Sequence, residues 1–286
     1  MSNDKQLILV TGATGQQGGA TARALLKAGH TVRAMTRKPD GEPAKALAGL
    51  GAQVVRGDLD EPASLKQALA GAWGVFAIQN TWEAGVEREE EQGKRLAEVA
   101  KAVGVSHFVY TSVGSAHRKT GIPHFDNKAR VEEKVRALGF PSWVIIRPVF
   151  FMENLLSPWF KPAIDGGQLA AGIKPTTSLQ MVAVQDIGQY GKLAFERHAE
   201  LNGTAIDFAG DALTMPRAAE IISRAAGRKV VHFQVPIAEV RKFSEDFALM
   251  LEWFDAVGYD ADIAGNAKTY GIRPTPFAEW TAKSAW

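Results

Sequence analysis

The stretch that decides the fold reads Val10-Thr11-Gly12-Ala13-Thr14-Gly15-Gln16-Gln17-Gly18-Gly19. It joins an apolar run of strand-forming residues to a pattern of helical period that begins at Gln16. The glycines at 12, 15 and 18 relax the spacing of the dinucleotide fingerprint but keep its physical parts: a tight turn, close backbone approach to a pyrophosphate, and close packing of helix on strand. We therefore predict a dinucleotide site here, with a glycine-rich turn that binds nothing as the plainer alternative.

The first half of the chain alternates short apolar runs with longer stretches of helical period. This alternation is typical of βαβ units, which build a parallel sheet covered by helices on both faces. The pattern predicts strands at Leu7–Thr11, Thr31–Thr36, Gln53–Arg56, Gly74–Ile78, His107–Thr111 and Trp143–Arg147, and helices at Gln16–Ala28, Pro43–Leu50, Pro62–Leu69, Val86–Val103 and Asn127–Leu138. Each helix should end before a left-handed glycine, at Gly29, Gly51, Gly71, Gly104 and Gly139.

After Arg147 the rhythm changes, because prolines and glycines break the chain into short pieces. We therefore predict an α/β fold: a Rossmann-type doubly wound parallel sheet with a smaller, mostly helical C-terminal lobe. Residues 1–150 should form the nucleotide domain, and 181–209 should return to it as a strand at 181–184, a helix at 185–197 and a strand at 205–209. The smaller lobe, for a substrate or a partner, should comprise 151–180 and 210–286.

The end of the second strand decides which dinucleotide binds, since an acidic residue there would hydrogen-bond the ribose 2′-hydroxyl of NAD. Here the strand ends in Thr36-Arg37-Lys38, about twenty residues after Gly18. Two adjacent cations suit a 2′-phosphate, and an arginine can bind two of its oxygens at once. The sequence predicts NADP(H) as the cofactor, with a solvated basic turn as the alternative.

Polar residues also follow the third and fourth strands. Asp58 either accepts a hydrogen bond from the adenine amino group, with Leu59 covering the ring, or caps the helix that begins near Pro62. Gln79 and Asn80 stand at the carboxyl edge of the sheet, where open α/β folds bind ligands, although polar residues there often mark only the exit of a strand.

The chain resembles the NmrA-like branch of the atypical short-chain dehydrogenase/reductase superfamily over nearly its whole length. The likeness is carried by Gly12–Gly19, Thr36-Arg37-Lys38-Pro39, Asn80-Thr81-Trp82-Glu83, His124-Phe125-Asp126-Asn127-Lys128, Val131-Glu132-Glu133, Glu153-Asn154-Leu155-Leu156 and Arg228-Lys229-Val230-Val231-His232. Within the family it is most similar to the NADPH-sensor type. The resemblance implies cofactor contacts at Gly12, Ala13, Thr14, Gly15, Gln16, Gln17, Arg37, Lys38, Asp58, Leu59, Gln79, Asn80, Lys128, Phe151, Met152, Glu153 and Asn154.

The chain departs from the parent superfamily at the position of the proton donor. Ordinary members carry Tyr-x-x-x-Lys, whereas this chain has His124-Phe125-Asp126-Asn127-Lys128. Lys128 can still hold the nicotinamide ribose, as the resemblance implies. His124 is either a replacement general acid, since imidazole titrates near neutral pH, or a structural residue at the start of a helix. We take His124 and Lys128 as the candidate catalytic pair, and the spacing of the other histidines predicts no metal site.

Composition excludes several classes of function. The 33 Lys+Arg and 31 Asp+Glu give a net charge of +2, too small a basic excess to favour direct binding of nucleic acid. There are 0 cysteines, so thiol-based redox chemistry is excluded. No apolar run approaches the ~18 residues of a membrane span, and residues 1–5 show no targeting leader, so we expect a cytoplasmic protein without a membrane segment.

Two functions remain. In the first, NADP(H) occupancy orders loops such as Gly114–Pro123 and regulates a partner protein that reads the altered surface. In the second, the protein is an NADPH-dependent oxidoreductase for quinone-like or other conjugated acceptors, which take protons from solvent once reduced. The missing tyrosine favours the regulator. The residues name neither the acceptor nor the partner, nor the oligomeric state.

Overall fold

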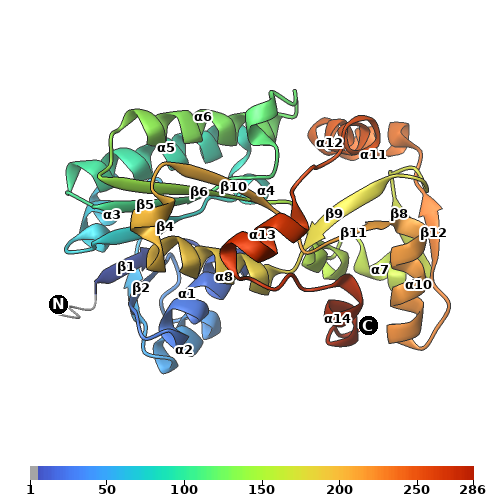
Figure 1. Ribbon diagram of the computed structural model, residues 1–286, viewed down its shortest axis with the longest axis horizontal. Coiled ribbons are helices and arrows are strands. Elements are labelled where there is room, and N and C mark those ends of the chain that lie inside the picture. Colours follow the sequence, from blue (N-terminus) through green and yellow to red (C-terminus); the bar gives the residue numbers. More distant parts are fainter. Residues whose placement is uncertain (1–5) are drawn as a thin grey trace. The chain divides into compact units, whose positions relative to one another are not determined.

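A computed structural model describes residues 6–286, whose elements are shown in Figure 1. The first five residues, where we expect no targeting leader, lie outside the described range. The chain forms two compact units. Among the described residues, unit 1 comprises 6–113 together with Asp126–Arg147 and Ile187–Ile206. Unit 2 comprises Gly114–Phe125, Pro148–Asp186 and Asp207–Trp286.

Unit 1 is built on a seven-stranded sheet in the order β10-β6-β5-β4-β1-β2-β3. Every neighbouring pair from β3 to β6 is parallel. The strands are β1 (Leu7–Val10), β2 (Thr31–Thr36), β3 (Gln53–Arg56), β4 (Gly74–Ala77), β5 (His107–Thr111), β6 (Ser142–Pro148) and β10 (Thr204–Phe208). The strand order reverses between β1 and β4, and open α/β sheets bind ligands at the carboxyl ends of the strands beside such a reversal.

Helices cover both faces of this sheet, as Figure 1 shows. On one face lie α1 (Gln16–Lys27), α2 (Glu42–Gly49) and α8 (Val184–Glu196), and on the other α3 (Pro62–Leu69), α5 (Val86–Ala102) and α6 (Pro123–Ala137). The short helices α4 (Thr81–Ala84) and α9 (His198–Leu201) complete this part of the chain. A Cβ atom at Gly188 of α8 would lie 2.7 Å from the carbonyl oxygen of Ala20, so glycine lets α8 pack closely on α1.

The face under α3, α5 and α6 holds a continuous apolar core. Fully buried side chains of the strands meet those of the helices there, among them Val75, Phe108, Tyr110, Leu65, Leu96 and Val135. Burying a side chain of this size contributes roughly 1.5–3 kcal/mol, so the core holds the strand ends in fixed positions.

The predicted α/β class is confirmed, and the expected strands and helices of the first half are present. The five glycines predicted to end helices have φ between 62° and 98°. The main difference is α6, which begins at Pro123 rather than at Asn127. Proline suits the first turn of a helix, because its missing N–H would have no partner there. His124 and Lys128 therefore lie on one helix, four residues apart.

Unit 2 contains a three-stranded sheet, in the order β11-β9-β7, and a two-stranded sheet of β12 and β8. Its strands are β7 (Phe150–Phe151), β8 (Gln168–Ala171), β9 (Ser178–Val182), β11 (Asp211–Thr214) and β12 (Val231–Gln234). Its helices are α7 (Lys161–Asp165), α10 (Met215–Ala226), α11 (Ile237–Phe243), α12 (Glu245–Ala256), α13 (Ile263–Tyr270) and α14 (Phe277–Ala282), with 3-10 turns at Ala116–Arg118 and Met152–Leu156.

The strand predicted at 181–184 does not join the main sheet. β9 pairs antiparallel with β11 and parallel with β7, whereas β10 does lie in the seven-stranded sheet. An alternating apolar pattern specifies a strand but not its partner, so this part of the expectation was wrong. No helix within residues 6–286 has the length and apolar character that crossing a membrane requires.

Candidate functional site

The loop between β1 and α1, Gly12–Gly18, leaves the start of α1 open to a ligand. Gly15 is the N-cap residue, and no side chain caps this helix within the described residues. The turn closes on itself instead, because the Gly15 N–H donates to the Gly12 carbonyl at 2.9 Å. The first amides of an uncapped helix carry partial positive charge, so this end suits an anionic group.

The three glycines of the fingerprint lie in different surroundings, and each has a different structural role. Gly12 has a φ of 55°, and a Cβ there would lie 2.7 Å from Cγ2 of Ile78. At Gly18 a Cβ would lie 2.3 Å from the Gly12 carbonyl oxygen, so helix and loop touch at this point. At Gly15 a Cβ would meet only the Gly12 carbonyl oxygen, at 3.3 Å, with no other atom within 4 Å among the described residues, so the space in front of the helix is otherwise open. The loop therefore fits a diphosphate that approaches the backbone at Gly15.

Side-chain hydrogen bonds hold the strand ends around this loop. Thr11 Oγ1 accepts from the Ile78 N–H at 2.9 Å, which ties the end of β1 to the end of β4. Gln17 Oε1 accepts from the hydroxyl of Thr111, the last residue of β5, at 2.7 Å. The hydroxyl oxygens of Thr14 and Thr36 lie 3.4 Å apart.

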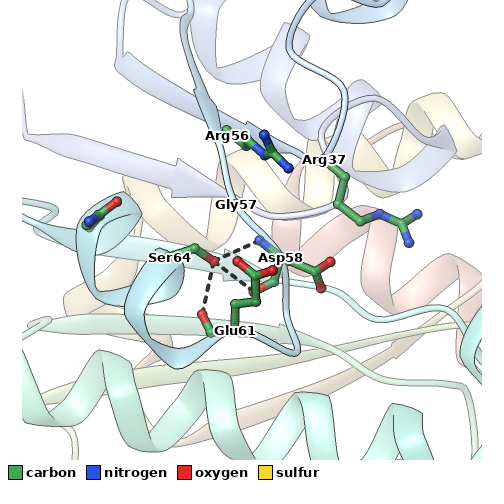
Figure 2. Close-up of a pocket in the computed structure, with 7 residues that line it drawn as sticks. Arg37, Arg56, Gly57, Asp58, Glu61 and Ser64 are labelled. Carbon is green, nitrogen blue, oxygen red and sulfur yellow. Dashed lines mark hydrogen bonds between the residues drawn. The ribbon is translucent and has the colours of Figure 1, made fainter.

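A cavity of about 260 Å³ opens at the ends of β2 and β3 (Figure 2), and we call it the Arg37 cavity. It is lined by Arg37, Arg56, Gly57, Asp58, Glu61, Ser64 and Gln67. Arg37 and Asp58, which were predicted from the sequence to contact the nucleotide, both line this cavity. Lys38 and Leu59 do not, and Leu59 packs against the apolar core instead.

Two arginines and two acidic residues line the cavity, and a third acidic residue, Glu83, pairs with Arg37. The Arg37 guanidinium pairs with the carboxylate of Glu83 on α4, and the hydrogen bond between them raises the pKa of Arg37. Asp58 Oδ1 accepts from the Asp60 N–H at 3.0 Å and closes a turn, while Glu61 is the N-cap residue of α3. Asp58 therefore does not cap that helix, which was the alternative reading of its position.

The two polar residues after β4 have different environments. Asn80 Oδ1 accepts from the Trp82 N–H at 3.2 Å and caps α4. Gln79 is buried, and neither polar atom of its amide has a partner among the described residues. An unsatisfied buried amide costs about 1–3 kcal/mol, so a polar group of a bound ligand fits at Gln79.

Lys128 lies in a buried polar cluster of unit 1. Its ammonium contacts Glu89 Oε1 and lies 3.2 Å from Thr81 Oγ1. Glu89 is 2% exposed and also accepts from Asn127 Nδ2 at 2.8 Å. Sequence reasoning missed Glu89, because it stands in a run of charged residues on α5 that reads as a solvated helix face. The cation that the resemblance assigns to the ribose is therefore already paired.

His124 has a carboxylate partner within unit 2. Its Nδ1 lies 2.6 Å from Oδ1 of Asp246 on α12, and His124 is 7% exposed. A carboxylate on Nδ1 fixes the orientation and tautomer of an imidazole, an arrangement that suits proton transfer. Asp246 is 122 residues away along the chain, so no local pattern could have identified it.

The segment Phe151–Asn154 lies in unit 2 and has its own contacts there. Met152 is fully buried, while Phe151 is partly exposed. The Glu153 carboxylate accepts from the Val184 N–H at 3.0 Å and from Trp280 Nε1 at 2.9 Å. Burial raises the pKa of Glu153, and those hydrogen bonds offset part of the effect. In this structure Glu153 joins three segments of unit 2.

Fold and site together define a protein with a Rossmann-type fold of the kind that binds nicotinamide dinucleotides. The model of the NmrA-like family matches residues 4–281, and the chain belongs to this family, as its sequence predicted.

Two relatives illustrate the match. The NmrA-like family domain-containing protein DDB_G0286605 of Dictyostelium discoideum is 29% identical over an alignment of 299 residues, gaps included. The alignment covers 96% of this chain and 97% of that protein. The NmrA-like family domain-containing oxidoreductase FrzB of Cladobotryum sp is 34% identical over 171 residues, which cover 56% of this chain and 51% of FrzB. The match to FrzB thus spans about half of each protein.

Solved structures agree on the fold. The Citrobacter sp. triphenylmethane reductase complexed with NADP(H) has a TM-score of 0.80 at 22% identity, covering 98% of this chain and 100% of that one. NmrA, a negative transcriptional regulator solved in complex with NADP, has a TM-score of 0.78 at 23% identity, covering 98% and 95%. The same fold thus occurs in a reductase and in a regulator.

Proposed function

We propose that unit 1 binds NADP(H). The open start of α1 would hold the pyrophosphate, Arg37 the 2′-phosphate and Asp58 the adenine amino group, while Gln79 and Asn80 lie beside the rest of the nucleotide. The observation that carries the proposal is the uncapped helix behind Gly15, with an arginine-lined cavity at the neighbouring strand ends. Relatives of the same fold that were solved with NADP(H) support it.

We further infer that the protein is a regulator whose signal is its own nucleotide occupancy. Three features of the chain support this role. A histidine stands where the superfamily has its tyrosine acid, and the Lys128 ammonium is held by Glu89. In unit 2, Ser115 and Lys119 have left-handed φ values of 64° and 50°, and their segment, Gly114–Pro123, is the one that we expect nucleotide to reorder.

A second candidate is an NADPH-dependent oxidoreductase that acts on quinone-like or other conjugated acceptors. The pairing of His124 with Asp246 favours it, because an oriented imidazole can deliver a proton. Curated relatives named as oxidoreductases favour it too. In that reaction NADPH gives up a hydride and becomes NADP⁺. A neutral acceptor such as a quinone gains the hydride and then one proton, either from His124 or from solvent, whereas a cationic dye is neutralised by the hydride alone.

One set of measurements separates the two functions. Nucleotide affinity is measured by calorimetry, and NADPH absorbance is then followed with quinones, azo dyes, triphenylmethane dyes and enals. Tight NADPH binding without turnover, together with changed hydrogen exchange in Gly114–Pro123, supports the regulator. Turnover of NADPH with any of these acceptors supports the oxidoreductase, and a fall of at least about tenfold in both His124→Phe and Asp246→Asn would assign delivery of the proton to His124. Failure of both NADPH and NADH to bind would refute both functions.

Lys128 needs a matched control in these assays. Lys128→Ala would leave the buried Glu89 without its cation, so lost activity could reflect lost stability rather than lost contact with a ribose. The double variant Lys128→Met with Glu89→Gln removes both charges together. If it folds stably but binds NADPH more weakly than wild type, Lys128 contacts the nucleotide.

A further inference from the structure

Two arginines line the Arg37 cavity: Arg56, the last residue of β3, and Arg37, the residue that follows β2. β2 and β3 are parallel, and their register places Arg56 opposite Thr36, the residue before Arg37. Neighbouring strands lie about 4.8 Å apart, so the backbones of the two arginines lie at adjacent points of the carboxyl edge of the sheet. Both side chains line the same cavity. In the view of Figure 2 both arginines lie above Asp58 and Glu61.

We propose that Arg56 is the second cation of the 2′-phosphate subsite and determines the preference for NADP(H) over NAD(H). This inference rests on the proposed binding of NADP(H) by unit 1. It gives Arg56 the role that the sequence pattern assigns to Lys38, which does not line the cavity. Two guanidinium groups can share the oxygens of one phosphate through paired N–H donors.

The charges around the cavity explain why one arginine is insufficient. Asp58 and Glu61 also line it, and both repel a phosphate dianion at neutral pH. Arg37 is already paired with Glu83, whereas Arg56 makes no ion pair within residues 6–286. Without Arg56, an incoming phosphate would meet two carboxylates and one guanidinium that carries its own carboxylate partner.

Glu83 is the group that the phosphate displaces. Its pairing with Arg37 is solvent-exposed, with side-chain exposures of 53% for Glu83 and 59% for Arg37. Exposed ion pairs of this kind are weak, so a dianion held by two arginines competes successfully with one carboxylate. Glu83 therefore lowers the affinity for the phosphorylated nucleotide and leaves the affinity for NAD(H) unchanged. This effect on NADP(H) affinity is opposite in sign to that of Arg56.

The test uses the full chain and calorimetry with four probes: NADPH, NADH, 2′,5′-ADP and 5′-AMP. Arg56→Gln should weaken NADPH and 2′,5′-ADP at least about tenfold while leaving NADH and 5′-AMP within about twofold. Lys38→Gln, the matched control at a neighbouring cation, should change all four probes by less than about threefold. Glu83→Gln should strengthen NADPH about two- to fivefold and leave NADH unchanged.

Several results would overturn the inference. It fails if Arg56→Gln behaves like Lys38→Gln, or if it weakens NADPH and NADH equally, provided that thermal unfolding shows the variant to be folded. Wild-type protein that binds neither NADPH nor NADH refutes the proposed function as well. If the wild-type protein prefers NADPH and the Arg56→Gln variant has the same preference, only the role of Arg56 is refuted.

Discussion

Replacing Gly18 with alanine should damage both the fold and the site. The added Cβ would lie 2.3 Å from the Gly12 carbonyl oxygen and 2.7 Å from that of Thr11. Non-bonded heavy atoms attract at about 3.5 Å, so helix and loop must separate by about 1 Å. All of the obstructing atoms are backbone, which cannot rotate away. We expect a cost near the upper end of the range for overpacking, about 3 kcal/mol.

Gly15→Ala separates the packing role from the binding role. Its backbone, at φ −94° and ψ −171°, is allowed for alanine, and the new Cβ would meet one atom, at 3.3 Å. Stability should therefore fall by less than about 1 kcal/mol. If a diphosphate approaches the backbone here, NADPH affinity should nevertheless fall at least about tenfold. Gly49→Ala in α2 is the control, because its Cβ meets nothing within 4 Å.

Urea unfolding and calorimetry with NADPH measure both effects on the same preparations. Gly18→Ala should lower the unfolding midpoint and lose nucleotide binding, and its melting temperature should fall on the order of 10 °C. Gly49→Ala should be as stable as wild type, or more so by up to about 1 kcal/mol. Wild-type stability in Gly18→Ala would refute the packing argument, and wild-type affinity in Gly15→Ala would refute the approach of a phosphate.

Two further predictions concern buried charge. Burial, assisted by the nearby His198, lowers the pKa of His107 to about 4. Below pH 6.5, His107 of the unfolded chain therefore binds a proton that His107 of the folded chain does not bind. Compared with His107→Gln, the wild type should lose about 2 kcal/mol more unfolding free energy between pH 7.5 and pH 5, and parallel pH curves would contradict this. Lys128→Met should cost about 3 kcal/mol by leaving Glu89 buried and unpaired, and adding Glu89→Gln should restore more than half of it. Additive losses in the urea-denatured double variant would show that the two side chains are not coupled.

Local patterns in the sequence were enough for the first half of the fold. β2, β3, β5 and α3 begin and end at their predicted residues, because periodicity, proline at a helix start and glycine at a helix end are properties of neighbouring residues. The start of α6 was missed by four residues, because the regular apolar spacing of this helix, at Val131 and Val135, begins only beyond Asn127. The partner of β9 was also missed, because any exposed strand edge offers the same hydrogen bonds.

The candidate site divides in the same way. The positions of Gly12, Gly18 and Arg37 in the fold were predictable, because each is defined by its distance along the chain from a strand end, while their contacts with a nucleotide stay a prediction. Arg56 was read only as the last residue of a strand, and the register of β3 on β2 is what brings it beside Arg37. Glu83 lies 46 residues from Arg37, and only the position of α4 brings it there.

By itself, the sequence determined the α/β class, the glycine loop and the family of this protein, because these depend on residue spacing along one chain. The tertiary structure decided which charges meet. It paired Lys128 with Glu89, His124 with Asp246 and Arg37 with Glu83. Coulombic and hydrogen-bond energies depend on distance in space, which strand order and helix packing set and which spacing along the chain does not record.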